Sequence, residues 1–595
     1  MRQAMARRWR MVPLLAAMAA VAGCGGGDGI ADSADGMADL TAALLGQDHG
    51  KARGRVPQLS PARPALLAGT CADLPARLAG LPHTSIASAE AVLAGALTVG
   101  GNPVREHCLV KGSMHARVSP VDGNSYAIGF EMRLPTEWNG RFLHQGNGGI
   151  DGAVVPATGA TGGGPLTHAL HQGFAVLSSD AGHAGSLGPT FGIDPQARLD
   201  YGYQAVGKLT PMAKDLIQAA YSKRPDRSYF AGCSNGGRHA MVAATRYAKD
   251  YDGILAGAPG YNLPKAAIAN IAGAQLYASV ATGSDLSTAF TTAERKLVGA
   301  AVLAKCDALD RARDGLVQDV EACQRAFDLQ RDVPTCGGAR DGTCLSQPQK
   351  DAIAKIFRGP TTSDGRRIYA SFPYDPGIAG GGIPFWEFTA PLALDSGAVG
   401  MIFKVPPVSP ASFNGPAFSL GADLDALVRE IHATNSLYTE SAMSFMTPPE
   451  PTDMSALGRR GGKIIVYHGV SDPIFSVDDS EAWYKGLLWE SRGLAAGFAR
   501  FYRVPGMGHC SGGPATDQFD ALSKLVAWVE RGTEPGAIIA SARGAGDPGG
   551  ANGDLPSDWS AGRTRPLCPY PLVARYRRGD VESAASFRCE LPLLH

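Results

Sequence analysis

The chain has 595 residues, which is more than one ordinary domain needs and leaves room for a core with a large insertion. Lysine plus arginine and aspartate plus glutamate are equal at 55 each, and this zero net charge argues against a polyanionic partner such as nucleic acid. The charged content of 18% and the 76 glycines are typical of a loop-rich secreted enzyme, not of a disordered or coiled-coil protein.

An export signal is predicted at the N-terminus. Four arginines stand among the first ten residues, and Met11 to Val21 is an apolar run too short to span a membrane. Val21-Ala22-Gly23-Cys24 resembles a bacterial lipobox, which predicts a signal peptide over residues 1–23 and a lipid on Cys24. The alternative is a simple signal peptide that is cleaved nearby. Residues 24–69, rich in Gly, Ala and Asp, are expected to form a flexible tether.

These features predict an exported protein. It is expected to be lipid-anchored in the bacterial envelope, at the outer membrane or cell surface, or else to be secreted or periplasmic. No later apolar run is long enough to cross a bilayer, so the expected membrane contact is through the lipid alone. The sequence does not indicate an oligomeric state.

Residues 70–265 alternate strand and helix patterns, which predicts the first part of a mostly parallel sheet flanked by helices. Apolar runs predict strands at 126–133, 142–145 and 174–179, and a longer pattern predicts a helix at 203–221.

A glycine-rich loop, Gln145 to Gly149, follows the second of these strands. Because glycine lets the backbone approach a carbonyl closely, the loop is expected to supply one N–H of an oxyanion hole. Gly149 is the first choice for this donor and Gly148 the second; a plain tight turn is the alternative.

A nucleophile elbow is predicted at Gly232-Cys233-Ser234-Asn235-Gly236-Gly237. This G-x-S-x-G sequence lies between an apolar strand, 228–231, and a helical run, 237–247, so the turn should lift the Ser234 hydroxyl toward a substrate. The backbone N–H of Asn235, directly after the serine, is the expected second oxyanion donor.

Residues 266–445 have a different texture, with three glycines at 380–382 and clustered prolines at 406–410. The segment interrupts the core after the predicted nucleophile and is expected to be a lid domain over the active site. Four lid aromatics either line an aromatic-binding wall or form the core of the lid, and the sequence favours neither reading. These four are Phe385, Trp386, Phe388 and Phe403.

The lid also carries three carboxylates within eight residues, Asp307, Asp310 and Asp314, which would repel one another without a cation. Calcium takes six to eight oxygens and accepts backbone carbonyls among them. These side chains and the carbonyls of Ala312 and Leu316 therefore predict a structural Ca²⁺ site. The spacing is not that of an EF-hand, and an acidic turn neutralised by the two arginines of the same loop is the alternative.

Residues 446–595 return to the strand and helix alternation and are expected to complete the core. A buried-strand pattern at 463–468 precedes a loop with Asp472, and a strand at 501–504 precedes a loop with His509. Asp472 is the expected acid and His509 the expected base of a triad with Ser234. The alternative for each residue alone is an ordinary turn aspartate and a surface histidine. Together with Ser234 they have the chain order Ser, Asp, His that α/β-hydrolases use.

Ten cysteines remain beside Cys24, an even number that predicts five disulfides in an oxidising compartment. Spacing alone does not fix the connectivity, but neighbours in the sequence suggest four pairs and leave Cys233 for Cys510, which would join the nucleophile loop to the base loop. Residues 567–589 lack periodicity and are expected to be a tail that its disulfide staples to the core. The other pairs are Cys71–Cys108, Cys306–Cys323, Cys336–Cys344 and Cys568–Cys589.

From about Cys71 to Cys589 the chain resembles the tannase/feruloyl esterase family of α/β-hydrolases, which includes the mono(2-hydroxyethyl) terephthalate (MHET) hydrolases. The resemblance implies an α/β fold, an α/β-hydrolase core with a large lid inserted between nucleophile and acid. The family's disulfide-linked triad falls on Cys233, Ser234, Asp472, His509 and Cys510, and its lid calcium site falls on Asp307, Asp310, Ala312, Asp314 and Leu316. The other matching runs are 192–200, 256–261, 467–469, 504–507 and 565–571.

One departure bears on the substrate. MHET hydrolases resemble one another in using a lid arginine for the free terephthalate carboxylate, and a guanidinium is the natural partner of that group. This chain has no arginine between Arg367 and Arg429, where Lys404 is the only cation, and 384–407 matches the family poorly. Neutral aromatic esters of the feruloyl or galloyl type are therefore the favoured substrates.

The expected activity is that of a serine carboxylic ester hydrolase that works through an acyl-enzyme intermediate. MHET hydrolysis is the alternative. A serine peptidase and a non-catalytic surface binding module are more remote, because the triad is complete and the lid and calcium loop resemble those of esterases.

Overall fold

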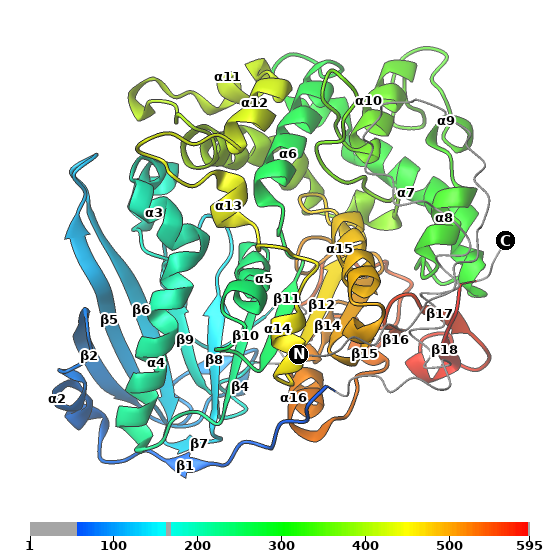
Figure 1. Cartoon of the computed structure of the whole chain (residues 1–595). Coiled ribbons are helices and arrows are strands. Elements are labelled where there is room, and N and C mark those ends of the chain that lie inside the picture. The colour runs from blue at the N-terminus through cyan, green and yellow to red at the C-terminus, as the bar shows by residue number, and fades with distance from the viewer. Residues whose placement is uncertain (1–55, 162–167, 593–595) are drawn as a thin grey trace, which may run out of the picture.

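The computed structural model describes residues 56–161 and 168–592 and is built around a nine-stranded sheet in the order β13-β12-β11-β10-β8-β9-β6-β5-β2 (Figure 1). The strands from β9 to β13 along this order are parallel, whereas β2, β5 and β6 are antiparallel to their neighbours. The bounds are β2 Thr84–Val92, β5 His107–Val118, β6 Ser125–Pro135, β8 Arg141–Gly146, β9 Ala175–Ser179, β10 Arg227–Cys233, β11 Gly253–Gly257, β12 Lys463–Gly469 and β13 Ala499–Val504.

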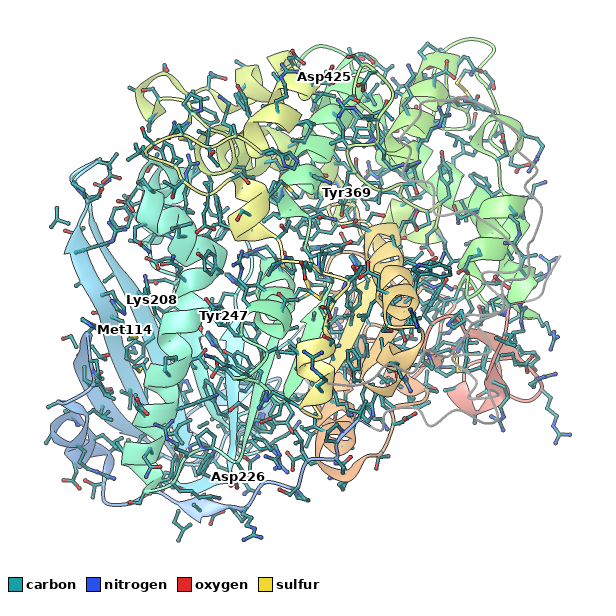
Figure 2. All side chains as sticks on the ribbon, viewed as in Figure 1. Met114, Lys208, Asp226, Tyr247, Tyr369 and Asp425 are labelled. Atoms are coloured by element: carbon teal, nitrogen blue, oxygen red, sulfur yellow. A yellow bond between two sulfur atoms is a disulfide. The ribbon has the colours of Figure 1, made fainter. Side chains whose placement is uncertain are left out.

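Helices cover both faces of this sheet. One face packs against α4 (Ala205–Tyr221), α5 (Asn235–Arg246) and α15 (Val477–Glu490), and the other packs against α16 (Ala521–Arg531). Side chains fill the layers between them (Figure 2). Tyr247, for example, lies so close to α4 that a Cβ on Gly207 would be 2.5 Å from its hydroxyl. The fold is that of an α/β-hydrolase, with parallel strands buried on both faces.

The segment that follows β11 leaves the sheet and returns at β12. Figure 1 shows its helices above the end of the sheet where the parallel strands finish. One hydrophobic core lies within this segment, and a second joins it to the rest of the chain, for example to Tyr201 and Phe475. The principal helices are α6 Leu263–Ala278, α7 Thr292–Cys306, α8 Val320–Ala326, α10 Gln347–Arg358, α11 Gly415–Gly421, α12 Leu424–Ile431 and α13 Ala442–Met446.

Residues 385–403 of this segment form wide π-type helical turns, at Phe385–Thr389, Pro391–Asp395 and Ala398–Phe403. Arg198, from the short helix α3 (Pro195–Leu199), anchors the last of them. Its guanidinium donates to the carbonyl oxygens of Met401, at 2.8 Å, and Lys404, at 3.2 Å.

The core strands and helices agree with the sequence prediction to within a few residues, but three features differ. The antiparallel strands β2 and β5 were not predicted. Residues 56–69, expected to belong to a flexible tether, lie on the core: β1 (Ala65–Leu66) pairs with β7 (Glu137–Trp138), and Gln58 donates to the Val529 carbonyl over 2.7 Å.

The third difference concerns the C-terminal tail, which is not irregular. β16 (Thr564–Leu567) joins a small sheet with β14 (Gln518–Phe519) and β15 (Ile538–Ser541), and β17 (Val573–Tyr576) forms a hairpin with β18 (Phe587–Glu590). The predicted signal peptide, Cys24 and the first part of the tether lie outside the described residues. Within the described ranges, no helix is both long and apolar enough to cross a membrane.

All five predicted disulfides are present: Cys71–Cys108, Cys233–Cys510, Cys306–Cys323, Cys336–Cys344 and Cys568–Cys589. Such a number is typical of proteins that fold in an oxidising compartment.

Candidate active site

Ser234 lies at the sharp turn between β10 and α5, with a left-handed φ of 66° and a ψ of −129°. Its neighbours in the motif must be glycine because the backbones approach so closely there. A Cβ on Gly236 would be 2.3 Å from the Gly146 carbonyl oxygen, and one on Gly237 would be 2.3 Å from that of Gly257. The elbow therefore presses against β8 and β11, and the serine side chain projects at the end of the sheet.

His509 and Asp472 complete a continuous hydrogen-bonded chain with this serine. His509 Nε2 lies 2.8 Å from Ser234 Oγ, and His509 Nδ1 lies 2.7 Å from Asp472 Oδ2. The two residues follow β13 and β12, so the ends of three parallel strands bring the predicted triad together. The arrangement allows an imidazole to take the hydroxyl proton while the carboxylate holds it in orientation.

Asp472 is fully buried and is held as an anion. Burial by itself would raise its pKa, but attraction to His509 and hydrogen bonds from His468 and His509 lower the pKa well below its ordinary value. The carboxylate also accepts the backbone N–H groups of Ile474 and Phe475, both over 3.0 Å. It therefore stays ionised and can stabilise an imidazolium.

His468 is a residue of this site that the sequence reasoning did not single out. It is the last residue but one of β12, lies 3.3 Å from Asp472 Oδ2 through Nε2, and is completely buried. The same Nε2 is 2.9 Å from the Phe475 carbonyl oxygen, so His468 holds the loop that carries the acid. The sequence offered one signal for this role, namely a histidine four residues before the predicted acid.

The Cys233–Cys510 bridge joins the residue before the serine to the residue after the histidine, with the Cα atoms 6.1 Å apart. Its two halves are 277 residues apart in the sequence. The bridge therefore fixes the nucleophile loop to the base loop without help from the intervening lid.

A sequence model described as "Tannase and feruloyl esterase" matches residues 108–590. The chain belongs to this family. It is 39% identical over 534 residues to a mono(2-hydroxyethyl) terephthalate hydrolase of Piscinibacter sakaiensis, covering 83% of this chain and 86% of the relative. It is 29% identical over 440 residues to a probable feruloyl esterase B-2 of Aspergillus flavus, covering 70% and 78%.

Two solved structures share the fold. Feruloyl esterase B of Aspergillus oryzae superposes with a TM-score of 0.68 at 22% identity, covering 87% of this chain and 100% of that one. Tannin acyl hydrolase of Aspergillus niger superposes with a TM-score of 0.61 at 19% identity, covering 88% of this chain and 96% of that one. Membership of the tannase and feruloyl esterase family and the named relatives show a carboxylic ester hydrolase.

Both residues predicted for the oxyanion hole of this family member line the pocket at Ser234. Gly149 and Asn235 lie on its wall with the serine, whereas Gly148 does not. Gly149 has a left-handed φ of 62°, and a Cβ built there would meet no atom within 4 Å, so its surroundings are open. Residues from two different loops thus border the pocket beside the serine.

A buried polar cluster lies behind these donors. Asn235 Nδ2 donates to Asp151 Oδ2 over 2.7 Å, and His239 Nε2 lies 2.8 Å from the same oxygen. Arg238 donates to Asn235 Oδ1 over 2.7 Å. Burial raises the pKa of Asp151 to about 7. Arg238 and His239, on the elbow helix α5, are both buried next to an oxyanion residue, which gives them a place in the site.

The lid aromatics divide between the two readings left open by the sequence. Trp386 and Phe403 line the pocket at Ser234, together with Phe475 from the acid loop. Trp386 and Phe475 also contact His509 edge-on, with ring centroids 4.9 and 5.4 Å away. Phe388 instead belongs to a core of the lid, and Phe385 is half-exposed.

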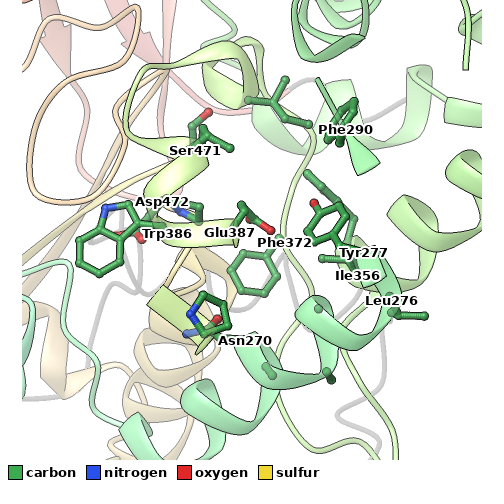
Figure 3. A pocket seen from close by; sticks show the side chains of 18 of the residues that line it. Asn270, Leu276, Tyr277, Phe290, Ile356, Phe372, Trp386, Glu387, Ser471 and Asp472 are labelled. Carbon is green, nitrogen blue, oxygen red and sulfur yellow. The ribbon is translucent and has the colours of Figure 1, made fainter. Parts of the chain in front are cut away.

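Behind Trp386 the lid contains a second cavity, shown in Figure 3. Trp386 and Asp472 line it together with Asn270, Phe372 and Glu387. Burial raises the pKa of Glu387 to about 7. This cavity meets the catalytic pocket at Trp386, which lines both.

The lid loop with Asp307, Asp310 and Asp314 is ordered by hydrogen bonds from its own backbone to these carboxylates. Burial, together with the neighbouring carboxylates of Asp314 and Asp307, raises the pKa of Asp310 to about 8. Arg311 of the loop lies 3.5 Å from Glu590, and the buried Arg565 of β16 pairs with Asp314. Burial raises the pKa of Asp307, and attraction to Arg313, the other arginine of the loop, opposes this rise.

The donor types of this loop suit calcium, since they are carboxylate and carbonyl oxygens, the hard ligands that Ca²⁺ takes. No donor in the described residues hydrogen-bonds to the carbonyl oxygens of Ala312 or Leu316, which leaves both available. The carboxylates do not converge in this arrangement: within 56–161 and 168–592, no three His, Cys, Asp or Glu side chains form a group that could hold a metal ion.

Proposed function

We propose that the protein is a serine esterase that cleaves esters of aromatic carboxylic acids, of the feruloyl or galloyl type, through an acyl-enzyme intermediate. The observation that carries this proposal is the unbroken chain from Ser234 Oγ through His509 to Asp472, at 2.8 and 2.7 Å.

In the first step, His509 Nε2 takes the proton of Ser234 as its Oγ forms a bond to the ester carbonyl carbon. The carbonyl oxygen becomes an oxyanion, which the backbone N–H groups of Asn235 and Gly149 stabilise. The tetrahedral species then collapses, the bond to the alcohol oxygen breaks, and His509 returns the proton to this leaving group.

In the second step, water attacks the acyl-serine. His509 now takes a proton from the water, and the acid leaves as Ser234 recovers its hydrogen. Asp472 stays ionised throughout and offsets the charge of the imidazolium, consistent with its lowered pKa.

An aromatic acyl group suits the pocket because Trp386, Phe403 and Phe475 line it with ring surface. MHET hydrolysis is the second candidate, supported by the relative of that name at 39% identity. The two differ in one chemical respect: MHET carries a free carboxylate that a cation would have to neutralise.

Calcium is proposed as a structural ion of the lid, held by Asp307, Asp310 and Asp314 with the carbonyls of Ala312 and Leu316. These side chains would have to turn toward one another to coordinate it. The ion would neutralise the loop and hold the shape of the lid, with no part in the ester chemistry.

Export is supported by the disulfides, and a lipid anchor on Cys24 is proposed from the lipobox-like sequence alone. Mass spectrometry of the mature N-terminus from a bacterial host tests the anchor: a diacylglyceryl-modified Cys24 supports it, and an unmodified N-terminus excludes it.

The enzymatic proposal is tested by measuring kcat/KM on methyl ferulate, methyl gallate and MHET, with Ser234→Ala as the control. Hydrolysis that disappears in the variant supports the catalytic assignment. Equal hydrolysis by both proteins would overturn it, and a preference for MHET would move the second candidate to first place.

A further inference from the structure

Asp395 ends one of the π-type turns of the lid, Pro391–Asp395, and lines the catalytic pocket. It shares this wall with Ser234, Trp386 and Phe403, although it is 161 residues from the serine in the sequence (395 − 234). Only 3% of its surface is exposed. Wide helical turns of this kind occur often at functional sites, where they re-aim a side chain.

Among the residues that the structure describes, the carboxyl of Asp395 has one hydrogen-bond partner. Asn270 Nδ2, on α6, donates to Oδ2 over 3.2 Å. Burial raises the pKa of Asp395 to about 8, and the hydrogen bond from Asn270 opposes this only in part. A buried carboxyl costs free energy unless its hydrogen-bonding capacity is used, so a group that is retained with a single partner has room for a second.

Cations are absent from the described lining of this pocket, which includes neither Lys nor Arg. Lys404, the one cation between Arg367 and Arg429, points elsewhere: its Nζ lies 3.4 Å from Glu430 and donates to the Pro406 carbonyl over 3.0 Å. Arg198 is also committed, since it donates to carbonyl oxygens of the lid. A second carboxylate on the acyl group would therefore lie near the Asp395 carboxyl, and no cation of the described lining would neutralise it.

We propose that Asp395 determines specificity by accepting a hydrogen bond from a ring hydroxyl of the aromatic acid and by disfavouring acids with a second carboxylate. The inference rests on the proposed esterase function and names the side chain that would recognise the ring hydroxyl of the aromatic acid. A hydroxyl can both donate to and accept from a carboxyl, which gives Asp395 its second partner in either protonation state. An acyl group without the hydroxyl leaves the carboxyl under-bonded in the complex.

The test compares esters that differ in one group. The neutral pairs are methyl 4-hydroxycinnamate with methyl cinnamate and methyl 4-hydroxybenzoate with methyl benzoate, which place the hydroxyl at two depths. Monomethyl terephthalate supplies the carboxylate. We expect the protein to favour the hydroxylated member of at least one pair by about 10-fold or more in kcat/KM, and to hydrolyse monomethyl terephthalate less well than methyl benzoate.

Two variants separate the roles of the side chain. Asp395→Leu should bring the hydroxyl preference close to 1, because no acceptor remains. Asp395→Asn keeps an acceptor oxygen but cannot ionise, so it should retain part of the preference. Above about pH 8, where the parent carboxyl ionises, it should hydrolyse monomethyl terephthalate better relative to methyl benzoate than the parent does. Glu387→Gln is the matched control: it removes a buried carboxyl from the neighbouring cavity and should leave both ratios as they are in the parent.

The measurement is a ratio, so it does not depend on how much of a variant folds. Equal kcat/KM values within both pairs for the parent, or an unchanged ratio in Asp395→Leu, would overturn the inference while the esterase assignment stands. A parent that favours monomethyl terephthalate would do the same. A parent no more active than Ser234→Ala on every ester would instead refute the proposed function and the inference with it.

Discussion

The side-chain amide of Asn235 donates a hydrogen bond to Asp151 over 2.7 Å, and so connects the residue after the nucleophile to the end of the oxyanion loop. The Asp151 N–H in turn bonds to the Gly148 carbonyl over 3.2 Å, which closes the loop as a turn. The two loops that supply the proposed oxyanion donors thus share one buried carboxyl.

Replacement of Asp151 by alanine should therefore weaken transition-state stabilisation. We expect kcat on a neutral aryl ester to fall by about 10- to 100-fold with a smaller change in KM, because the loss concerns the oxyanion and not the bound ester. Steady-state kinetics of Asp151→Ala checks this, with the exposed Asp215→Ala as control. A change confined to KM would contradict it.

Asp472→Asn should leave the site assembled but reduce kcat by about 10⁴-fold, since the amide favours the wrong imidazole tautomer. It should also destabilise the protein near neutral pH. The folded-state pKa of Asp472 is lowered, so its ionised form contributes stability above the unfolded pKa and loses it as the pH falls through the acidic range. The melting temperatures of parent and variant should approach each other toward low pH; a gap that is independent of pH would contradict this.

For Asp395, stability should depend on pH in the opposite direction. Its folded-state pKa is raised to about 8, so the protonated form is the stable one, and stability is lost as the pH rises from about 4 through 8. Asp395→Asn mimics the protonated form. It should melt higher than the parent by a few degrees at about pH 8, with a smaller gain at about pH 5. Thermal denaturation at the two values checks this; an equal gain at both would count against it.

Loss of the long-range disulfide should cost more than loss of a short one. The Cys233–Cys510 bridge spans 277 residues and the Cys336–Cys344 bridge 8. The chain-entropy account gives roughly 5.6 kcal/mol for the first and roughly 2.5 kcal/mol for the second. Denaturant unfolding of the two double Cys→Ser variants tests the order, and the first variant should also lose activity, because Ser234 and His509 are then tied only through the fold.

Calcium removal should lower the melting temperature of the parent, and added Ca²⁺ should restore it in a concentration-dependent way. Asp310→Asn should weaken that response, whereas Asp425→Asn, on the lid surface, should not. A melting temperature that is insensitive to both chelator and Ca²⁺ would exclude the site.

The sequence was sufficient for the triad because each member stands in a loop directly after a buried parallel strand. Parallel strands read as continuous apolar runs, and their ends meet at one edge of the sheet. The antiparallel strands β2 and β5 were missed because they carry small and polar residues, as in the Thr84–Val92 segment, which leave no apolar run to recognise.

The tail was missed for an electrostatic reason. Its strands bury Arg565 and Arg575, which pair with Asp314 and Asp319 of the lid loop, so the inward positions are charged. A pattern that searches for alternating apolar residues has nothing to find there. The pairs are also more than 200 residues apart in the sequence, with separations of 251 and 256.

The polar residues of the site that the sequence did not indicate also have partners that are far away in the sequence. Asp151 has its partner Asn235 84 residues away, and Asp395 has Asn270 125 residues away. Each of these carboxyl groups matters because it is buried together with its partner, and this contact forms only in the folded chain.

Arg198 holds the pocket-forming turns of the lid through the backbone oxygens of Met401 and Lys404, not through their side chains. Every amino acid offers such an oxygen, so this attachment tolerates sequence drift in the segment it secures. Residues 384–407 can therefore change in sequence, and with them the substrates of the pocket, while the hydrogen bonds from Arg198 remain. The lid turns that line the substrate pocket can thus change in sequence while the hydrolase core that carries the triad stays intact.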